Sequence, residues 1–292
     1  MRVLDAAALR AALPWPRAIA ALEAAFRDED PGATPPRSHL TVPGGELLLM
    51  PAHGAAGVGV KLVTLAPGNP ANGLPFIQGA YVLFSADGLV PEALLDGAEL
   101  TAIRTAAVSA LATDRLARPD ARSLVVFGAG TQARVHVEAM RAVRPIASVA
   151  IVGRDPGRAR ALADELGAEL ADPEAVAGAD IVCTCTTSAE PLFDGARLAS
   201  GTHVNAIGAY RPDLRELDDT AMRRATVVVE TRAAALAEAG DVIGAGLDPD
   251  ALLELGDVVR GATGRPEPDA ITVFKSVGLA LEDLAVARAA LG

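Results

Sequence analysis

Residues 123–133 read Ser-Leu-Val-Val-Phe-Gly-Ala-Gly-Thr-Gln-Ala, and this stretch decides the fold. Its first five residues form an apolar run of strand length, and a helical pattern begins at residue 131. Between them lies the G-x-G-x-x-A spacing that is typical of a dinucleotide-binding turn. There Gly128 permits the tight turn, Gly130 lets a pyrophosphate approach the backbone, and Ala133 allows the helix to pack closely on the strand. The alternative is a glycine-rich turn without a ligand, and the flanking strand and helix favour the nucleotide site.

Strands and helices alternate from residue 118 onward. The expected strands are 123–127, 148–152, 180–185, 203–207 and 227–230, and the helices between the first of them are 131–143 and 156–166. Apolar strands that are separated by helices are typical of a parallel sheet covered on both faces. The sequence therefore predicts a Rossmann-type domain over residues 118–270 and an α/β fold class.

The first third of the chain has a different, mixed pattern. Helices are expected at 5–12, 15–28 and 97–117, and apolar runs at 46–50, 57–65 and 76–85 indicate a sheet with antiparallel character. An amphipathic helix is expected at 276–290, beyond the alternating region, with Val277, Leu281 and Leu284 on one side. Residues 1–117 and 271–292 are therefore predicted to form a second, mixed α+β domain.

The end of the second predicted parallel strand indicates which dinucleotide binds. NAD sites place Asp or Glu there, whereas this chain has Gly153-Arg154-Asp155 followed by Arg158. Two guanidinium groups without a carboxylate at the strand tip suit a 2′-phosphate, and Asp155 is expected to cap the helix that follows. NADPH is therefore favoured over NADH. The alternative is that both arginines are solvated surface charges.

Two cations stand in apolar sequence. Lys61 is the single formal charge between residues 47 and 86, and Arg104 is the only charged residue between Glu99 and Asp114. A cation in such a setting is costly unless an anion pairs with it. The pair therefore suggests a pocket for a carboxylate. The alternative is that Lys61 reaches solvent and Arg104 pairs with an acid that is distant in the sequence.

Composition excludes several classes of protein. Of the 292 residues 51% are hydrophobic, which excludes a disordered chain, and the net charge of −11 argues against a nucleic-acid or anionic-membrane binder. The longest uncharged run, 62–86, is broken by prolines and glycines and is not a membrane helix. Two cysteines build no disulfide framework, and four scattered histidines give no metal site. We expect a cytoplasmic protein with a small-molecule partner and no metal.

Several motifs together resemble the ornithine cyclodeaminase/mu-crystallin family. They keep the order and spacing of that family over nearly the whole chain, at residues 61–70 (KLVTLAPGNP), 73–75 (GLP), 96–97 (DG), 104–107 (RTAA), 128–133 (GAGTQA) and 274–278 (FKSVG). Within the family, the mu-crystallin and ketimine reductase members are most similar at residues 208–219 (GAYRPDLRELDD), 235–241 (ALAEAGD) and 255–261 (LGDVVRG). The resemblance implies a homodimer, each subunit having a substrate-binding and dimerisation domain around an inserted Rossmann domain.

The resemblance also implies roles for single residues. The substrate carboxylate would be held by Arg37, Lys61 and Arg104, and Tyr210 is either a wall of this pocket or a surface aromatic. The residues expected to contact the cofactor are Arg104, Thr105, Gly128, Gly130, Thr131, Gln132, Arg154, Arg158, Thr184, Ala206, Ile207 and Ser276. Of these, Thr184 would lie beside the adenosine half, and the last three near the nicotinamide.

Two departures from the family pattern narrow the expected activity. Ornithine cyclodeaminases carry an acidic residue where this chain has Leu48 and a catalytic aspartate where it has Tyr210. Cyclodeamination needs such groups to handle amine protons and to hold the distal ammonium. We therefore expect NADPH-dependent reduction of a cyclic 2-imino acid, with Lys61 as the catalytic residue that donates or relays the proton to the nitrogen. The alternatives are a non-catalytic NADP-binding protein and an amino-acid dehydrogenase or ornithine cyclodeaminase.

Overall fold

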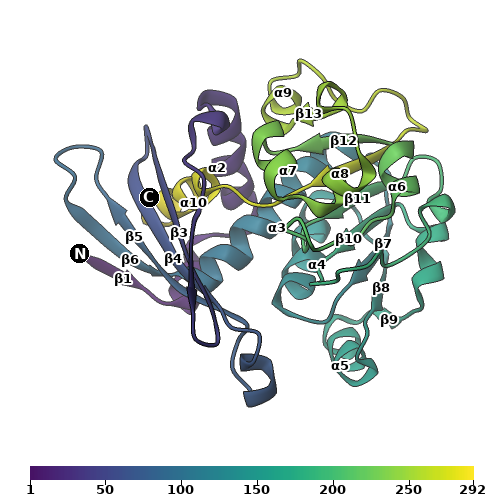
Figure 1. Cartoon of the computed structure of the whole chain (residues 1–292), viewed down its shortest axis with the longest axis horizontal. Coiled ribbons are helices and arrows are strands. Elements are labelled where there is room, and N and C mark those ends of the chain that lie inside the picture. Colours follow the sequence, from purple (N-terminus) through teal and green to yellow (C-terminus); the bar gives the residue numbers. More distant parts are fainter. The chain divides into compact units, whose positions relative to one another are not determined.

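The chain divides into two units in the computed structural model, which describes all of residues 1–292 (Figure 1). Unit 1 comprises Met1–Arg104 and Leu279–Gly292, and unit 2 comprises Thr105–Gly278. The predicted boundaries were 117/118 and 270/271. The first differs because helix α3 (Gly97–Leu116) runs through the boundary, and the second because residues 271–275 belong to the parallel sheet of unit 2.

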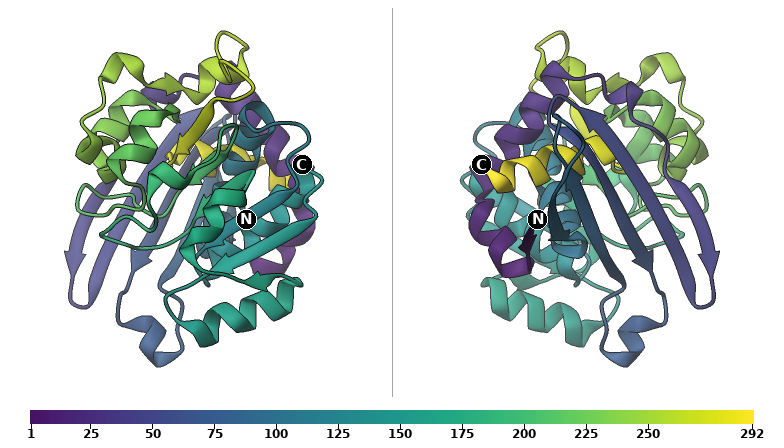
Figure 2. Two further views of the ribbon diagram at one scale, coloured as in Figure 1. Left: turned by 90° about the vertical axis from the view of Figure 1, so that its right-hand side faces the viewer. Right: turned by 90° about the vertical axis from the view of Figure 1, so that its left-hand side faces the viewer.

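Unit 1 is built on a mixed six-stranded sheet. Its order is β1 (Arg2–Leu4), β6 (Pro91–Asp96), β5 (Ile77–Phe84), β4 (Gly57–Leu65), β3 (Gly45–Gly54) and β2 (Ser38–Val42). Neighbouring strands are antiparallel except β1 and β6, which are parallel. The three predicted apolar strands and their antiparallel character are confirmed. The β4–β5 connection, with the short helix η2 (Asn69–Asn72), extends beyond the end of the sheet (Figure 2).

One face of this sheet is covered by helices α1 (Ala6–Ala12), α2 (Trp15–Asp28) and α10 (Ala280–Leu291). Residues of β4 alternate between the two faces, so that Lys61 and Val63 are buried whereas Leu62 between them is exposed. The buried set of β4 faces α10, because the Lys61 ammonium contacts that helix. This alternation fixes which side chains lie under the helix.

Helix α10 differs from the amphipathic helix that was expected at 276–290. It begins at Ala280, and it is buried almost all round, with Glu282 and Asp283 fully buried. The chain before it cannot be helical because Gly278 has φ +82° and its N–H is bonded to the Glu230 carboxylate. The two acids tolerate burial because cations of unit 1 pair with them.

Unit 2 is built on a parallel sheet, as predicted, and this sheet has eight strands. Its order is β13 (Leu253–Glu254), β12 (Ala225–Val229), β14 (Ile271–Lys275), β11 (His203–Ala206), β10 (Ile181–Thr184), β7 (Ser123–Phe127), β8 (Ser148–Val152) and β9 (Glu169–Leu170). Strand β14 lies between β11 and β12, so the assignment of residues 271–275 to the other domain was wrong. These five residues are all buried, which is typical of a central parallel strand.

Helices cover both faces of the parallel sheet. One face packs on α6 (Asp219–Arg224), α7 (Arg232–Glu238) and α8 (Gly240–Ala245), and the other on α4 (Thr131–Val143) and the C-terminal part of α3. The α3 side carries a buried polar network in which Asn205 donates to Thr113 Oγ1 and His203 bonds to Thr272. Burial lowers the pKa of His203 to about 3, so this imidazole is a neutral, structural group.

Helix α3 is the longest helix of the chain, with 20 residues. Its central part is alanine-rich and buried, which lets neighbouring elements approach it closely. The cation Arg104 lies within this buried part. No helix of the structure has both the length and the apolar character that crossing a membrane requires.

Candidate functional site

The turn from β7 to α4 leaves an open space at the start of a helix. Gly128 has φ +121°, and a Cβ there would lie 2.7 Å from the Cys185 carbonyl oxygen, so only glycine suits the turn. At Gly130, by contrast, a Cβ would meet no atom within 4 Å. Gly130 is the N-cap of α4, and no side chain caps that helix. The uncapped N–H groups of the first turn and this space fit the pyrophosphate of a dinucleotide.

The tip of β8 presents cations as the sequence indicates. Arg154 and Arg158 are both exposed, and the Asp155 carboxylate accepts a hydrogen bond from the Arg158 N–H at 3.0 Å. Asp155 therefore caps α5 (Pro156–Leu166), as predicted. Its carboxylate is committed to the helix backbone, and the two guanidinium groups are open to solvent.

A carboxylate that the sequence analysis missed organises the loops after β10 and β11. Glu216 is fully buried and accepts hydrogen bonds from the Thr184 hydroxyl (2.9 Å), from Thr186 N–H and Oγ1 (2.7 Å each), and from the Gly208 and Ala209 N–H groups (2.7 and 3.2 Å). Burial raises the pKa of Glu216. The Thr184 hydroxyl is therefore already bonded within the protein, and Glu216 fixes the shape of both loops.

Two further buried acids act on the same edge of the parallel sheet. Asp241 is fully buried and lies 2.8 Å from the Lys275 ammonium. Its Oδ1 also accepts hydrogen bonds from the N–H groups of Glu216 and Leu217, at 2.7 and 2.8 Å. Glu230 accepts a hydrogen bond from the Ser276 hydroxyl and from the backbone that follows. The loops at the carboxyl ends of β10, β11 and β14 are thus held by hydrogen bonds to buried carboxylates and by the Lys275–Asp241 ion pair.

The predicted substrate residues of unit 1 form a buried charged cluster. The Lys61 ammonium lies 2.9 and 2.8 Å from the two carboxylate oxygens of Asp283, and Arg104 Nη1 donates to Glu282 at 2.8 Å. Arg104 Nε lies 3.4 Å from Asp283, so both cations meet at this carboxylate. Burial lowers the pKa of Lys61 to about 8; the Asp283 charge opposes this shift, whereas the Arg104 and Arg37 charges add to it.

Arg104 thus pairs with an acid far along the sequence, which was the alternative to a free cation, and Lys61 is buried rather than reaching solvent. Arg37 is half-buried, and its charge acts on Lys61. Leu48 is buried on the same face of β3 as Met50, which lies directly opposite Lys61. Leu48 therefore places an apolar side chain near Lys61, at a position where an acid would be needed to bind the second ammonium of a diamino acid.

The remaining predicted residues lie in unit 2. Tyr210 is half-buried and packs against the apolar core of that unit. Thr131 is exposed, Gln132 is half-buried, and Thr105 is buried. Ala206 is the last residue of β11, Ile207 follows it, and both are buried. Their contacts with a substrate or a cofactor remain predictions.

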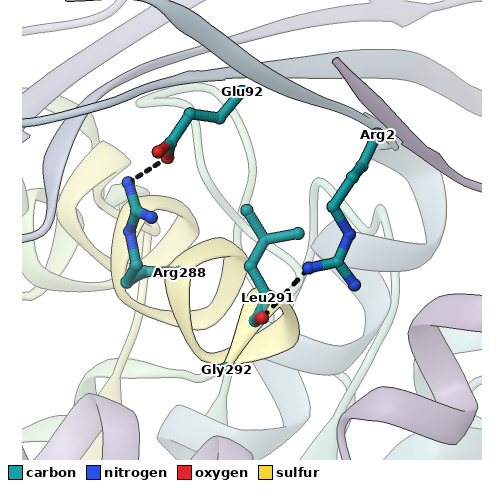
Figure 3. Close-up of a pocket in the computed structure, with 5 residues that line it drawn as sticks. All are labelled: Arg2, Glu92, Arg288, Leu291 and Gly292. Atoms are coloured by element: carbon teal, nitrogen blue, oxygen red, sulfur yellow. Dashed lines mark hydrogen bonds and ion pairs between the residues drawn. The ribbon is translucent and has the colours of Figure 1, made fainter.

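One cavity, of about 330 Å³, lies elsewhere in unit 1 (Figure 3). It is lined by Arg2, Glu92, Arg288, Leu291 and Gly292, none of which is a predicted site residue. Figure 3 shows that its charges are engaged within the protein: Arg288 pairs with Glu92 at 2.7 Å, and Arg2 donates to the Leu291 carbonyl. The structure contains no group of three or more His, Cys, Asp or Glu side chains that could hold a metal ion.

Comparison with known proteins gives consistent matches over the whole length. The family model described as ornithine cyclodeaminase/mu-crystallin matches residues 3–290. A Delta(1)-pyrroline-2-carboxylate reductase of Bacillus cereus is 40% identical over 258 residues, covering 82% of this chain and 79% of the relative. The ketimine reductase mu-crystallin of Rattus norvegicus is 41% identical over 251 residues, covering 84% and 79%.

Solved structures are similarly close. The Thermococcus litoralis Delta(1)-pyrroline-2-carboxylate reductase in complex with NADH and L-proline superposes with a TM-score of 0.93 at 33% identity, covering 99% of this chain and 96% of that one. An archaeal alanine dehydrogenase dimer with bound NAD gives a TM-score of 0.93 at 30% identity, covering 99% and 94%. The folds of both units therefore match those of proteins that bind a nicotinamide dinucleotide.

Proposed function

This chain belongs to the ornithine cyclodeaminase/mu-crystallin family, and from that premise we propose that it reduces cyclic 2-imino acids with NADPH. The substrates are Δ1-pyrroline-2-carboxylate, Δ1-piperideine-2-carboxylate or a close analogue. The observation that carries the proposal is the buried pair of cations in unit 1, Lys61 and Arg104. Support comes from the two named reductases that match about four fifths of the chain at 40 and 41% identity.

The substrate carries a carboxylate beside a C=N bond, and each of these groups has a counterpart in the cluster. Arg104, with Arg37, binds the carboxylate through charge-assisted hydrogen bonds. Lys61 delivers a proton to the imine nitrogen, because an ammonium with a pKa of about 8 is charged at neutral pH yet can release its proton. A bound nicotinamide supplies the hydride. The protein contributes mainly by holding the carboxylate and the C=N bond in a fixed orientation.

An apolar residue favours imine reduction over cyclodeamination in this chain. Leu48 is 3% exposed, and by the family resemblance it and Tyr210 stand where ornithine cyclodeaminases carry an acidic residue and an aspartate. The distal ammonium of a linear diamino acid would find no carboxylate to pair with at these two positions. A cyclic imino acid has no such second charge.

The proposal is tested by an assay panel with NADPH and NADH side by side. Oxidation of NADPH by Δ1-pyrroline-2-carboxylate or Δ1-piperideine-2-carboxylate is the expected result. Faster oxidation with pyruvate plus ammonia or methylamine would show an amino-acid dehydrogenase or amine-forming reductase instead. Tight NADPH binding without oxidation by any imino acid would show a binding protein.

NADPH is the proposed cofactor because of the arginines at the tip of β8. We expect Arg154→Ser to raise KM for NADPH by roughly 10- to 100-fold, since a hydrogen bond to a charged group contributes about 1.5–3 kcal/mol. KM for NADH should not change, because it lacks the 2′-phosphate. Arg160→Ser, at an exposed residue of the neighbouring helix α5, is the matched control. Equal effects of Arg154→Ser on both cofactors would exclude the assigned contact.

We further propose a homodimer that buries the uncovered face of the unit 1 sheet. Across five neighbouring strands, paired positions on this face are all apolar: Pro51, Val60, Val82, Leu94 and Val3. Val3 at the end of the row is 71% exposed. A continuous apolar row on one face of a sheet is typical of a surface that another protein covers.

Light scattering in solution should therefore give twice the subunit mass of 29.7 kDa. Val60→Asp should lower the mass towards that of one subunit, because a carboxylate would be buried in the interface. Leu236→Asp, at an exposed apolar residue of unit 2, is the control and should leave the mass unchanged. A wild-type protein of single-subunit mass at micromolar concentration would rule out this dimer.

A further inference from the structure

The use of lysine in this chain is unusual. Only two of its 26 basic side chains, excluding histidine, are lysines, Lys61 and Lys275, and every other one is an arginine. Both lysines are buried, 1 and 0% exposed, and each pairs with a fully buried aspartate at 2.8 Å. Arginine stays protonated under all ordinary conditions, whereas buried lysine changes its protonation state readily. Lysine is thus confined to two places where a cation is enclosed by protein.

The surroundings of Lys61 contain one anion that contacts it. Asp283 of α10 bonds to its ammonium, whereas Arg104 of α3 and Arg37, before β2, are cations. Tyr81 of β5 lies directly opposite Lys61 and is fully buried, and Met50 of β3 lies on the other side. Glu282, the neighbour of Asp283 on α10, bonds to Arg104 instead. The charge of Lys61 therefore depends on Asp283 more than on any other group.

We propose that Asp283 is the positioning residue of Lys61: it holds the ammonium beside Arg104 and keeps it protonated, so that α10 sets the charge state of the site. This inference rests on the proposed function only in giving Lys61 a part in the reaction. The contact itself is independent of any substrate. It joins residues 222 positions apart, which ties the last helix of the chain to the centre of β4.

The electrostatic argument follows from burial. An ammonium without water loses its charged form unless an anion replaces the water, and an opposite charge within about 4–6 Å shifts a pKa by roughly 1–3 units. Burial already lowers the pKa of Lys61 to about 8, with Asp283 acting against the shift. Without Asp283 the ammonium would face two cations and no contacting anion, and the neutral amine would dominate at pH 7.

The test uses the scarcity of lysine. Protein labelled with ¹³C,¹⁵N-lysine gives two side-chain spectra, and Lys275, paired with Asp241 in unit 2, is the internal reference. We expect Lys61 of the wild type to titrate well below a free lysine, and Asp283→Asn to lower that midpoint further, by at least about one unit. Glu282→Gln is the matched control, equally buried and next in sequence, and should shift it less.

A Lys61 midpoint in Asp283→Asn that equals the wild-type midpoint would overturn the proposal, and so would equal shifts in Asp283→Asn and Glu282→Gln. Should Asp283→Asn not fold, Asp283→Ser is measured in its place, together with Asp283→Glu. That variant keeps the charge and should keep the Lys61 midpoint while lowering kcat, because the ammonium is displaced.

Activity provides a second, separable readout. If Lys61 donates the proton, kcat/KM falls as pH rises through its pKa, so Asp283→Asn should move this fall to lower pH, and Lys61→Arg should remove it. If Asp283→Asn shifts the NMR midpoint of Lys61 but not the pH at which kcat/KM falls, Asp283 still controls the charge of Lys61, and Lys61 is not the proton donor. No shift in either measurement would reject the role of Asp283.

Discussion

Arg104→Ala is expected to lower kcat/KM for Δ1-piperideine-2-carboxylate by roughly 10²- to 10⁴-fold, while NADPH binding is largely retained. The magnitude follows from removing one partner of a buried charged contact, about 3–5 kcal/mol, at about 1.4 kcal/mol per factor of ten. The side chain is 7% exposed and bonds to Glu282 at 2.8 Å, so its guanidinium is fixed before any substrate arrives. Preorganised charge of this kind stabilises a bound carboxylate without reorganisation.

Steady-state kinetics and NADPH fluorescence check this prediction in the same preparation. Arg104→Lys should lose much of the rate as well, because an ammonium cannot form the two parallel hydrogen bonds of a guanidinium. Arg115→Ala, an exposed residue of the same helix, is the control for the loss of one arginine from α3. Unchanged activity of Arg104→Ala would refute the carboxylate assignment, and loss of the circular dichroism signal would show a structural role.

The elements that local pattern determines could be predicted from the sequence. Apolar runs gave β7 and β8 to the residue, and the glycine spacing located the turn before α4. Strand β14 was missed because its five residues, Ile-Thr-Val-Phe-Lys, end in a charge and sit after an irregular stretch. Only its pairing with β11 and β12 shows that it completes the sheet.

The candidate site divides in the same way. Lys61 and Arg104 were identified because their neighbours in sequence are apolar, and both are buried, whereas their contact with a substrate carboxylate stays a prediction. Their partners Glu282 and Asp283 were not, because an acidic pair near a helix start normally indicates a solvated first turn. The hydrogen bonds Lys61–Asp283 and Arg104–Glu282 join residues 222 and 178 positions apart, so no local sequence pattern could predict them.

Glu216 and Asp241 were missed for a related reason. Each stands among charged or small residues that are typical of a surface, yet each is fully buried and accepts backbone N–H groups. A buried carboxylate that accepts several N–H groups replaces the water those groups would otherwise bind. These hydrogen bonds form only where the folded chain brings several loops together around the carboxylate, and local sequence does not show where that happens.

Gly130→Ala is expected to weaken NADPH binding by roughly 10- to 100-fold without lowering thermal stability. A Cβ at this position meets no protein atom within 4 Å, and the residue has φ −109°, which alanine adopts freely. The methyl group would instead occupy the space that a pyrophosphate needs at the start of α4, and overpacking of this kind costs about 1–3 kcal/mol. Fluorescence titration with NADPH and a thermal melt measure the two effects.

Gly128→Ala should, unlike Gly130→Ala, lower thermal stability and is therefore the informative partner. At φ +121° an L side chain is strained by about 1–3 kcal/mol. Its Cβ would also press on the Cys185 carbonyl oxygen at 2.7 Å. The melting temperature should therefore fall by several degrees, at roughly 2–4 °C per kcal/mol for a chain of this size. If Gly130→Ala instead bound NADPH like the wild type, the pyrophosphate would not lie at this turn, and the dinucleotide site would have to be sought elsewhere along the parallel sheet.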